Sequence, residues 1–264
     1  MNRPSRPVRV LAPVLATGIL LAVAACGNQG GSSGTTSASP TPTSPATATP
    51  ALTGTGARAA LITKDDLGNN WTQANNAATW RDRLLVGNVD VAAFLNARTT
   101  DARCQKLLDS LYSDTLLGRA PGASALTGFT QGDARLLYQV GDYGQASLEK
   151  SLDWVKSLPD KCAQFTATGS DGGKRTVQVA KNSLPSAGDD RQGLTVTMRG
   201  TADGKPVTVT VDVAAVRVGA SGITVTNGGP SGAGHDTTAT AVRQGAQRLK
   251  DVLAGKTPPG TPSP

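Results

Sequence analysis

Few side chains in this sequence are suited to acid–base or metal chemistry. The chain has one histidine, His235, in the segment GGPSGAGHD, and one glutamate, Glu149. A single histidine excludes paired-histidine metal motifs, and it makes a Ser-His-Asp triad depend on one residue in a glycine-rich loop. We therefore expect His235 to be a solvated loop residue ahead of a helix cap, and we expect no catalytic residues.

Two pairs of neighbouring carboxylates are the next candidates for chemistry, Asp65 with Asp66 and Asp189 with Asp190. Adjacent side chains on a loop or on a first helical turn point apart, and helix caps or solvated turns account for such residues. We expect neither pair to bind a metal ion. The sequence thus predicts a protein that is not an enzyme and that carries no cofactor.

The chemistry that the sequence does indicate is lipidation of Cys26. The first ten residues carry three arginines and no acid, and the apolar run LAPVLATGILLAVAA follows them. A basic start and a short apolar core are typical of an export signal, and the run is too short to span a membrane. Val23-Ala24-Ala25-Cys26 resembles the bacterial lipobox, in which the cysteine receives a diacylglyceryl group and becomes the new N-terminus.

The cysteine count predicts one disulfide. The chain has three cysteines, so lipidation of Cys26 leaves Cys104 and Cys162 as a pair in an oxidising compartment. The alternative is two free, buried thiols. A disulfide would join the two helices that we expect near these cysteines.

The charge of the chain argues against nucleic acid as a partner. The sequence has 26 basic and 19 acidic side chains, and cleavage before Cys26 would remove three of the basic ones. Aromatic residues make up 3% of the chain and are not interleaved with basic ones. The remaining positive charge supports at most a weak preference for anionic lipid or wall polymer.

The composition divides the chain into four parts. We expect a lipoprotein signal peptide over 1–25, a lipidated cysteine with a disordered Ser/Thr/Pro/Gly linker over 26–56, one folded domain over 57–254, and a disordered tail over 255–264. The linker and the tail have too few large apolar residues to bury a core. The domain itself is long enough to have one.

Three helices are predicted within the domain. Apolar residues recur at helical spacing over Thr100–Ser113, capped by Thr100, over Gln145–Leu158, ended by Pro159, and over Asp236–Leu253. The six tyrosines and tryptophans are expected to fill the core, and Trp154 lies at the edge of its helix's apolar face, where it could line a cleft.

The predicted strands alternate between apolar and polar residues. Early strands are expected at 123–130, 134–142, 163–168 and 175–181. Asp203-Gly204 predicts a two-residue hairpin turn that pairs Ala202 with Lys205 and Val196 with Val211. We predict one α+β domain with a curved, mostly antiparallel sheet buried mainly on one face, and about three helices.

The last hairpin is predicted with less regular pairing. A turn over Gly219–Gly222 would pair Val218 with Ile223 and Val216 with Val225. The apolar pattern changes phase between Val213 and Val216. Either a bulge at Ala214-Ala215 keeps one face buried, or the sheet buries opposite faces in its two halves. We expect the bulge.

Three stretches of the domain resemble the extracellular sensor domain of PknH-type actinobacterial serine/threonine kinases and the lipoproteins that carry the same module. They are CQKLLDSLYS from Cys104, the stretch from Gly122 to Phe165, and VAAVRVGASGITVTNGG from Val213, which a closing helix follows. The resemblance implies a curved antiparallel sheet with a central cleft for an extracellular ligand, and no catalytic residues. The kinase sensors carry two disulfides, whereas this chain can form only one.

These features predict a lipid-anchored protein on the extracytoplasmic face of the cell membrane. Its domain would bind an envelope ligand or act as a sensory accessory through a membrane protein partner, with ligand-binding residues that the sequence does not identify. The alternatives are a carrier of lipid or glycolipid, which needs a large apolar cavity, and a structural wall-associated lipoprotein.

Overall fold

The structure is a computed structural model that describes residues 51–68 and 70–260. The expected signal peptide, Cys26 and most of the expected linker lie outside these residues. No helix in the described ranges is long and apolar enough to cross a membrane.

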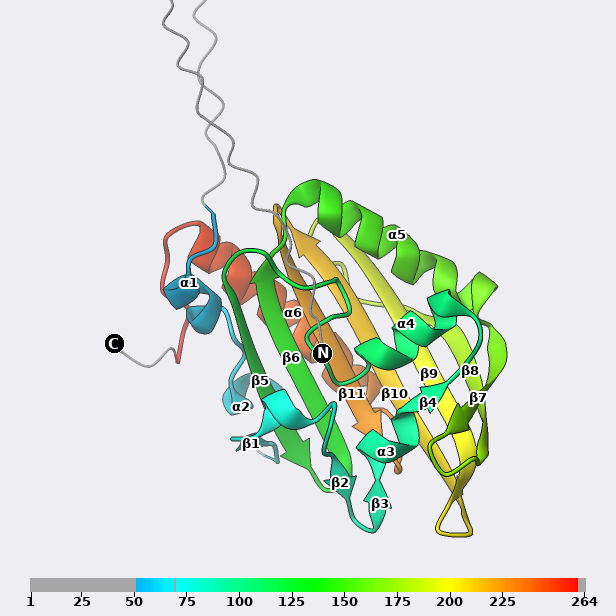
Figure 1. The fold of residues 1–264 in the computed structure, drawn as a ribbon. Helices are drawn as coiled ribbons and strands as arrows, with labels where there is room; N and C mark the ends of the chain where they lie inside the picture. The colour runs from blue at the N-terminus through cyan, green and yellow to red at the C-terminus, as the bar shows by residue number, and fades with distance from the viewer. Residues whose placement is uncertain (1–50, 69, 261–264) are drawn as a thin grey trace, which may run out of the picture. The chain divides into compact units, whose positions relative to one another are not determined.

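One nine-stranded antiparallel sheet organises the domain (Figure 1). Its strand order is β1-β5-β6-β11-β10-β9-β8-β7-β4, and every neighbouring pair is antiparallel. The strands are β1 (Thr72–Ala74), β4 (Ala97–Arg98), β5 (Ser124–Gln131), β6 (Ala134–Asp142), β7 (Gln164–Gly169), β8 (Lys174–Asn182), β9 (Asp190–Ala202), β10 (Lys205–Val218) and β11 (Ser221–Gly229). The strands β2 (Leu85–Val86) and β3 (Val89–Asp90) form a separate hairpin.

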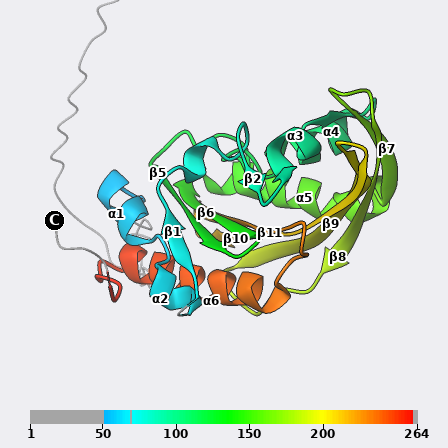
Figure 2. The ribbon, with the colours of Figure 1, turned by 90° about the horizontal axis from the view of Figure 1, so that it is seen from below.

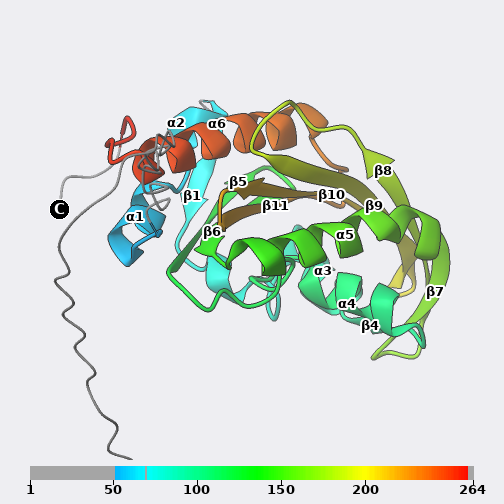
Figure 3. The same cartoon turned by 90° about the horizontal axis from the view of Figure 1, so that it is seen from above.

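Helices cover both faces of the sheet. The long helix α6 lies on one face, whereas α5 and α4 lie on the other (Figures 2 and 3). The helices are α1 (Gly54–Ala59), α2 (Lys64–Leu67), α3 (Val91–Leu95), α4 (Ala102–Ser110), α5 (Gln145–Lys161) and α6 (His235–Leu253), with a short 3-10 helix η1 (Ala77–Thr79). The predicted single α+β domain with a sheet and three main helices is confirmed.

The hairpin of β9 and β10 has the predicted register. Ala202 pairs with Lys205, and Val196 pairs with Val211. Asp203 and Gly204 both adopt positive φ, 50° and 72°, as a type I′ turn requires. The turn and the alternating apolar residues therefore agree on one register, because a shift by one residue would reverse every side chain.

The predicted pairing after Val218 is wrong by two residues. The turn contains only Gly219 and Ala220, so that Val218 pairs with Ser221 and Val216 with Ile223. Gly219 adopts a φ of 60°, which lets a two-residue turn form where a longer one was expected. A shift of two residues leaves each side chain on its predicted face.

The predicted bulge at Ala214-Ala215 is also wrong, because β10 pairs without interruption with both of its neighbours. Instead, β10 buries both of its faces. Val211, Val213 and Ala215 belong to the core under α5, whereas Ala214 and Val216 belong to the core under α6. The sheet is therefore not buried mainly on one face, and the change of apolar phase marks the strand that lies between two cores.

Two helix ends differ from the predictions. Asp101 rather than Thr100 caps α4, since its carboxylate accepts hydrogen bonds from the backbone nitrogens of Arg103 at 2.8 Å and Cys104 at 3.0 Å. Helix α5 continues through Pro159 to Lys161. A proline removes one backbone donor, and the last turn tolerates this loss because the backbone nitrogen of Cys162 still bonds to the Leu158 carbonyl at 2.7 Å.

Ordered contacts extend beyond residues 57–254 at both ends of the domain. Leu52 is buried, and α1 begins at Gly54. At the other end, the Arg248 guanidinium on α6 donates to the Pro259 carbonyl at 2.7 Å and lies 3.2 Å from the Asp66 carboxylate. This buried arginine therefore holds α2 and the end of the described chain against one helix.

Candidate functional site

A polar groove of about 470 Å³ opens on the α4–α5 face of the sheet. It lies where η1 and the end of α4 meet β5 and β6, so four separate segments contribute to it. The polar groove is lined by Ala77, Ala78, Arg81, Asp82, Asp109, Tyr112, Ser113, Asp114, Thr115, Ser124, Ala125, Leu126 and Gln139.

Arg81 is the cation of the polar groove, and Asp109 holds it in place. Its Nε donates to the Asp109 carbonyl at 3.1 Å, and its Nη2 lies 3.2 Å from Oδ1 of the same residue. Gln105 also donates to that carboxylate oxygen, at 3.0 Å. Within the described residues the Nη1 group of Arg81 makes no hydrogen bond. A fixed guanidinium with unused donors is suited to binding a polar ligand.

Tyr112 forms part of the wall of the groove in an unusual conformation. Its φ is 52°, a left-handed value that costs free energy for a residue with a side chain. Its hydroxyl donates to the Gly228 carbonyl at 2.7 Å, and its ring packs edge-on against Trp80 with centroids 6.1 Å apart. Burial raises the pKa of the Tyr112 hydroxyl, which keeps it a neutral donor.

Hydrogen bonds also connect the loop after Tyr112 to the middle of the sheet. Gln139 on β6 donates from Nε2 to the Asp114 carbonyl at 3.2 Å, and its Oε1 accepts from Thr224 of β11 at 3.3 Å. In the same loop, the hydroxyls of Ser113 and Thr115 lie 2.7 Å apart. Gln139 and Thr224 therefore form a polar part of the sheet beneath the groove, and the Gln139 bond fixes the loop above it.

The groove has more acidic than basic groups. Asp82 and Asp114 are exposed, and their carboxylates make no hydrogen bond among the described residues. The negative charge of Asp114 also acts on Tyr143. Burial raises the pKa of the Tyr143 hydroxyl, and the Asp114 carboxylate raises it further. No histidine or cysteine lines the groove, so its lining is suited to binding through charges and hydrogen bonds.

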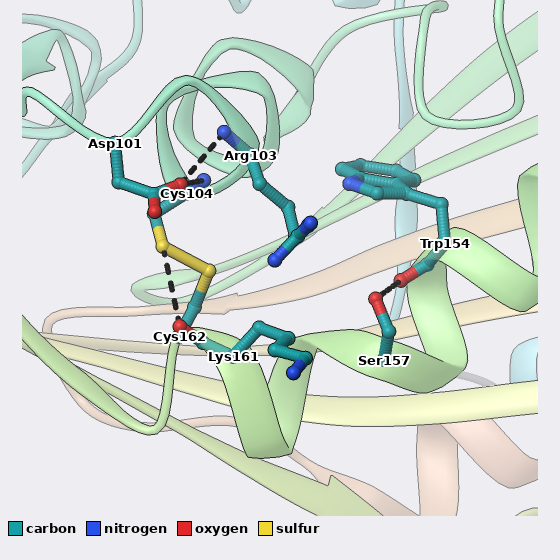
Figure 4. The surroundings of a disulfide bond; sticks show 7 residues. All are labelled: Asp101, Arg103, Cys104, Trp154, Ser157, Lys161 and Cys162. Carbon is teal, nitrogen blue, oxygen red and sulfur yellow. Dashed lines mark hydrogen bonds between the residues drawn. A yellow bond between two sulfur atoms is a disulfide. The ribbon is translucent and has the colours of Figure 1, made fainter.

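Cys104 and Cys162 form a disulfide, with their sulfur atoms 2.06 Å apart (Figure 4). Cys104 lies in α4 and Cys162 directly follows α5, so the bond joins the two helices as expected. The Asp101 carboxylate lies within 4.8 Å of both sulfur atoms. It is occupied as the cap of α4, and sulfur atoms bonded to each other are not thiolate ligands for a metal ion.

His235 is not simply a solvated loop residue. It begins α6, and its Nδ1 lies 3.2 Å from Oδ2 of Asp212, which is 3% exposed. Thr195 donates to the other oxygen of that carboxylate at 2.7 Å. The imidazole is 45% exposed, so the contact attaches the start of α6 to β10, apart from the polar groove.

The neighbouring aspartates bond to different partners. Asp65 pairs with Lys64, whereas Asp66 pairs with Arg248. Asp189 accepts from the Gly219 backbone at 2.6 Å. These side chains act as local structural groups rather than as a shared binding site. The remaining carboxylate singled out in the sequence, Glu149, lies on α5 and accepts a hydrogen bond from Gln145.

Sequence reasoning did not identify the polar groove. Its lining comes from segments that are distant along the chain, and η1 is too short to be predicted from periodicity. One signal was present: Gln139 and Thr224 are polar residues with apolar neighbours on both sides in their strands. A polar side chain at a buried strand position needs a hydrogen-bond partner, and here that partner is the loop that borders the groove.

The sequence matches no protein-family model and no curated protein. Among solved structures, the domain is similar to the extracellular domain of PknH from Mycobacterium tuberculosis, with a TM-score of 0.44 and 11% sequence identity. The similarity covers 79% of this chain and 100% of that one.

Proposed function

We propose that the protein is a lipoprotein anchored through Cys26 on the extracytoplasmic face of the membrane, and that its domain binds a small polar ligand of the cell envelope. The basic start, the short apolar run and the small residues before Cys26 support the anchor. In this role the domain acts as a sensory or accessory protein, and a membrane protein partner transmits its signal.

The observation that supports the ligand-binding role is that side chains of the polar groove are already fixed by hydrogen bonds within the protein. Arg81 is held by Asp109 before any ligand arrives, and the Tyr112 hydroxyl is fixed by its bond to the Gly228 carbonyl. Binding sites that are ordered in advance lose less entropy when a ligand binds. A volume of about 470 Å³ is in the range of small-molecule sites.

The charges of the groove favour a polar ligand over a lipid. A carrier for lipid or glycolipid would bury acyl chains against apolar side chains. The groove instead has Arg81 and three aspartates in its lining. A structural wall protein would not need an arginine fixed beside unpaired carboxylates.

The anchor is tested by Cys26→Ser. The variant should move from the membrane fraction to the soluble extracytoplasmic fraction, because a secreted domain without acyl chains has no stable attachment. Wild-type protein treated with lipase provides a positive control for release. Unchanged membrane retention of Cys26→Ser would contradict the anchor.

The ligand is tested on full-length protein isolated from its native host, by native mass spectrometry followed by extraction. We expect a small polar molecule bound to the wild type and lost from Asp82→Asn. Asp153→Asn is the matched control, because Asp153 is also an exposed aspartate without a hydrogen bond but lies on α5, outside the groove. A stoichiometric lipid would favour a carrier, and an empty protein would favour a structural role.

A further inference from the structure

Four basic side chains and one indole share the surface where α4 and α5 meet. Arg103 and Lys106 belong to α4, and Lys150, Trp154 and Lys161 belong to α5. Spacings of four and seven residues place the three α5 side chains along one stripe of that helix. Figure 4 shows the arginine, the indole and Lys161 around the disulfide that joins the helices. We call these five side chains the cationic row.

The ammonium group of Lys106 lies over the indole ring of Trp154, 3.9 Å from its centroid. This contact connects the two helices a second time, and it holds a cation at the centre of the row. Partial burial lowers the pKa of Lys106, and the positive charge of Lys150 lowers it further. The two ammonium groups are therefore close enough to repel each other.

In the part of the chain that the structure describes, the four cations of the cationic row form no ion pair. Within the described ranges, no carboxylate lies within 4.0 Å of any of its four cations. Asp101 caps α4, and its carboxylate is also within electrostatic reach of Arg103. The acids of α5, Glu149, Asp153 and Asp160, follow an adjacent stripe, in which Asp153 stands three residues from Lys150. Four of the more buried cations of the domain do have carboxylate partners within 4.0 Å: Arg81, Arg175, Arg217 and Arg248.

We propose that the cationic row binds a polyanion of the cell envelope, a glycan polymer that carries phosphate groups at intervals. From Lys150 to Lys161 the row extends about 16 Å along α5, at 1.5 Å per residue. A single anion would contact only part of this length, whereas a chain of phosphates can neutralise several cations at once. Repulsion between unpaired cations is relieved when such a ligand binds.

The cationic row lies on the side of the sheet away from the start of the domain. The described chain begins at Ala51, beside the end of α6, and α6 lies on the sheet face opposite α4 and α5 (Figure 3). This inference rests on the anchor proposed above, which places the domain among the polymers of the envelope. The length of the row, rather than the side on which it lies, favours a polymer with repeated phosphates.

The test compares two double variants in a full-length Cys26→Ser background, with long-chain polyphosphate and the phosphate-bearing wall glycan of the native host as probes. Lys106→Gln with Lys150→Gln should weaken binding about tenfold, because two of the four charges of the row are lost. The control is Lys174→Gln with Lys205→Gln, which removes two exposed lysines from strand ends elsewhere and should change affinity less than about twofold. Equal loss in both pairs, or no binding to either polymer, would overturn the proposal.

Trp154 provides a second measurement. It is half-buried, whereas Trp71 and Trp80 are 5% and 2% exposed, so acrylamide should quench its fluorescence preferentially. Polymer binding should protect it, and Trp154→Phe should abolish the protection. Vesicles containing phosphatidylglycerol form a separate arm: binding to vesicles through the row without binding to polymer would identify the bilayer as the occupant and contradict the proposal.

This inference and the ligand-binding role of the groove can fail independently. Asp82→Asn should retain polymer binding, and the lysine pair Lys106→Gln with Lys150→Gln should retain the small groove ligand. A loss of polymer binding in Asp82→Asn would show that the polymer occupies the groove, which would overturn the assignment to the cationic row.

Discussion

The two faces of the sheet are covered in different ways. On one face, α6 packs directly on the strands, and Gly245 lies so close to the Tyr138 ring that any larger side chain would clash with it. On the other face, α5 lies over β8 to β11, while α4 is attached to it by the disulfide and by Lys106. Between η1 and the end of α4, the loop after Tyr112, instead of a helix, borders the sheet.

This difference explains where the polar groove lies. A helix that approaches a sheet closely excludes ligand as well as water, because its side chains fill the space between them. Loops over a sheet leave uneven space, and their backbone groups need polar partners. Gln139 and Thr224 supply such partners beneath the groove. Both faces of the sheet therefore bury a core, and only the α4–α5 face also carries the candidate binding surfaces.

Loss of the disulfide, which lies on the α4–α5 face, should lower the free energy of unfolding more than any other change predicted here. For a sequence separation of 58 residues, the chain-entropy argument gives a loss of about 4 kcal/mol in the free energy of unfolding for Cys104→Ala with Cys162→Ala. Urea unfolding measures this loss. Reducing agent should lower the urea midpoint of the wild type and leave that of the double variant unchanged. Equal midpoints for reduced and oxidised wild type would contradict the prediction.

The α6 face should depend on close packing instead. Leu249→Ala removes a fully buried side chain from the α6 core, and we expect it to lower the free energy of unfolding by about 3 kcal/mol. Leu85→Ala is the matched control. Leu85 is 68% exposed, so its effect should be below about 0.5 kcal/mol. Similar losses for the two leucines would show that α6 does not carry the core of this face.

The contact of Arg248 with Asp66 should have a smaller effect. Asp66→Asn leaves a guanidinium that is 5% exposed without its carboxylate, and its Nε already lacks a partner among the described residues. We expect a loss of about 2 kcal/mol in unfolding free energy, because the buried charge becomes uncompensated. Asp65→Asn, at an exposed pair with Lys64, should change stability by less than about 0.5 kcal/mol. An equal effect of both variants would contradict a role for burial.

The smallest predicted effect is the pH dependence of the α4 cap. Hydrogen bonds from the Cys104 and Arg103 backbone nitrogens lower the pKa of Asp101 below its ordinary value of 3.8. A carboxylate with a lowered pKa stabilises the fold above that value, and its contribution is lost as the pH falls through the pKa of the folded state. Asp101→Asn keeps a capping side chain without a charge. The melting temperatures of the wild type and Asp101→Asn should therefore converge as the pH falls below 3.8, and a constant difference would contradict this prediction.

The sequence was most informative where the elements are long. The strands β5 to β8 and helix α6 lie within a residue or two of their predicted bounds, because alternation or helical spacing continues long enough to be recognised. The helices and strands from α1 to β4 are two to six residues long, which is too short for a periodic pattern to predict them. The three errors have different causes. Gly219 permits a tighter turn, Ala214 lies in a strand that is buried on both faces, and Pro159 lies in the last turn of its helix, where a missing donor is tolerated.

Some properties of this domain were determined by the sequence alone: the central hairpin register, the apolar faces of the long helices and the pairing of two cysteines that remains if Cys26 is lipidated. Only the tertiary structure decided that β10 lies between two cores, that Arg248 meets Asp66, and that Arg81 is held beside Asp109 in a polar groove. Periodic patterns report how a residue relates to its near neighbours along the chain. Contacts between distant segments depend instead on how helices and loops pack over the two faces of the sheet.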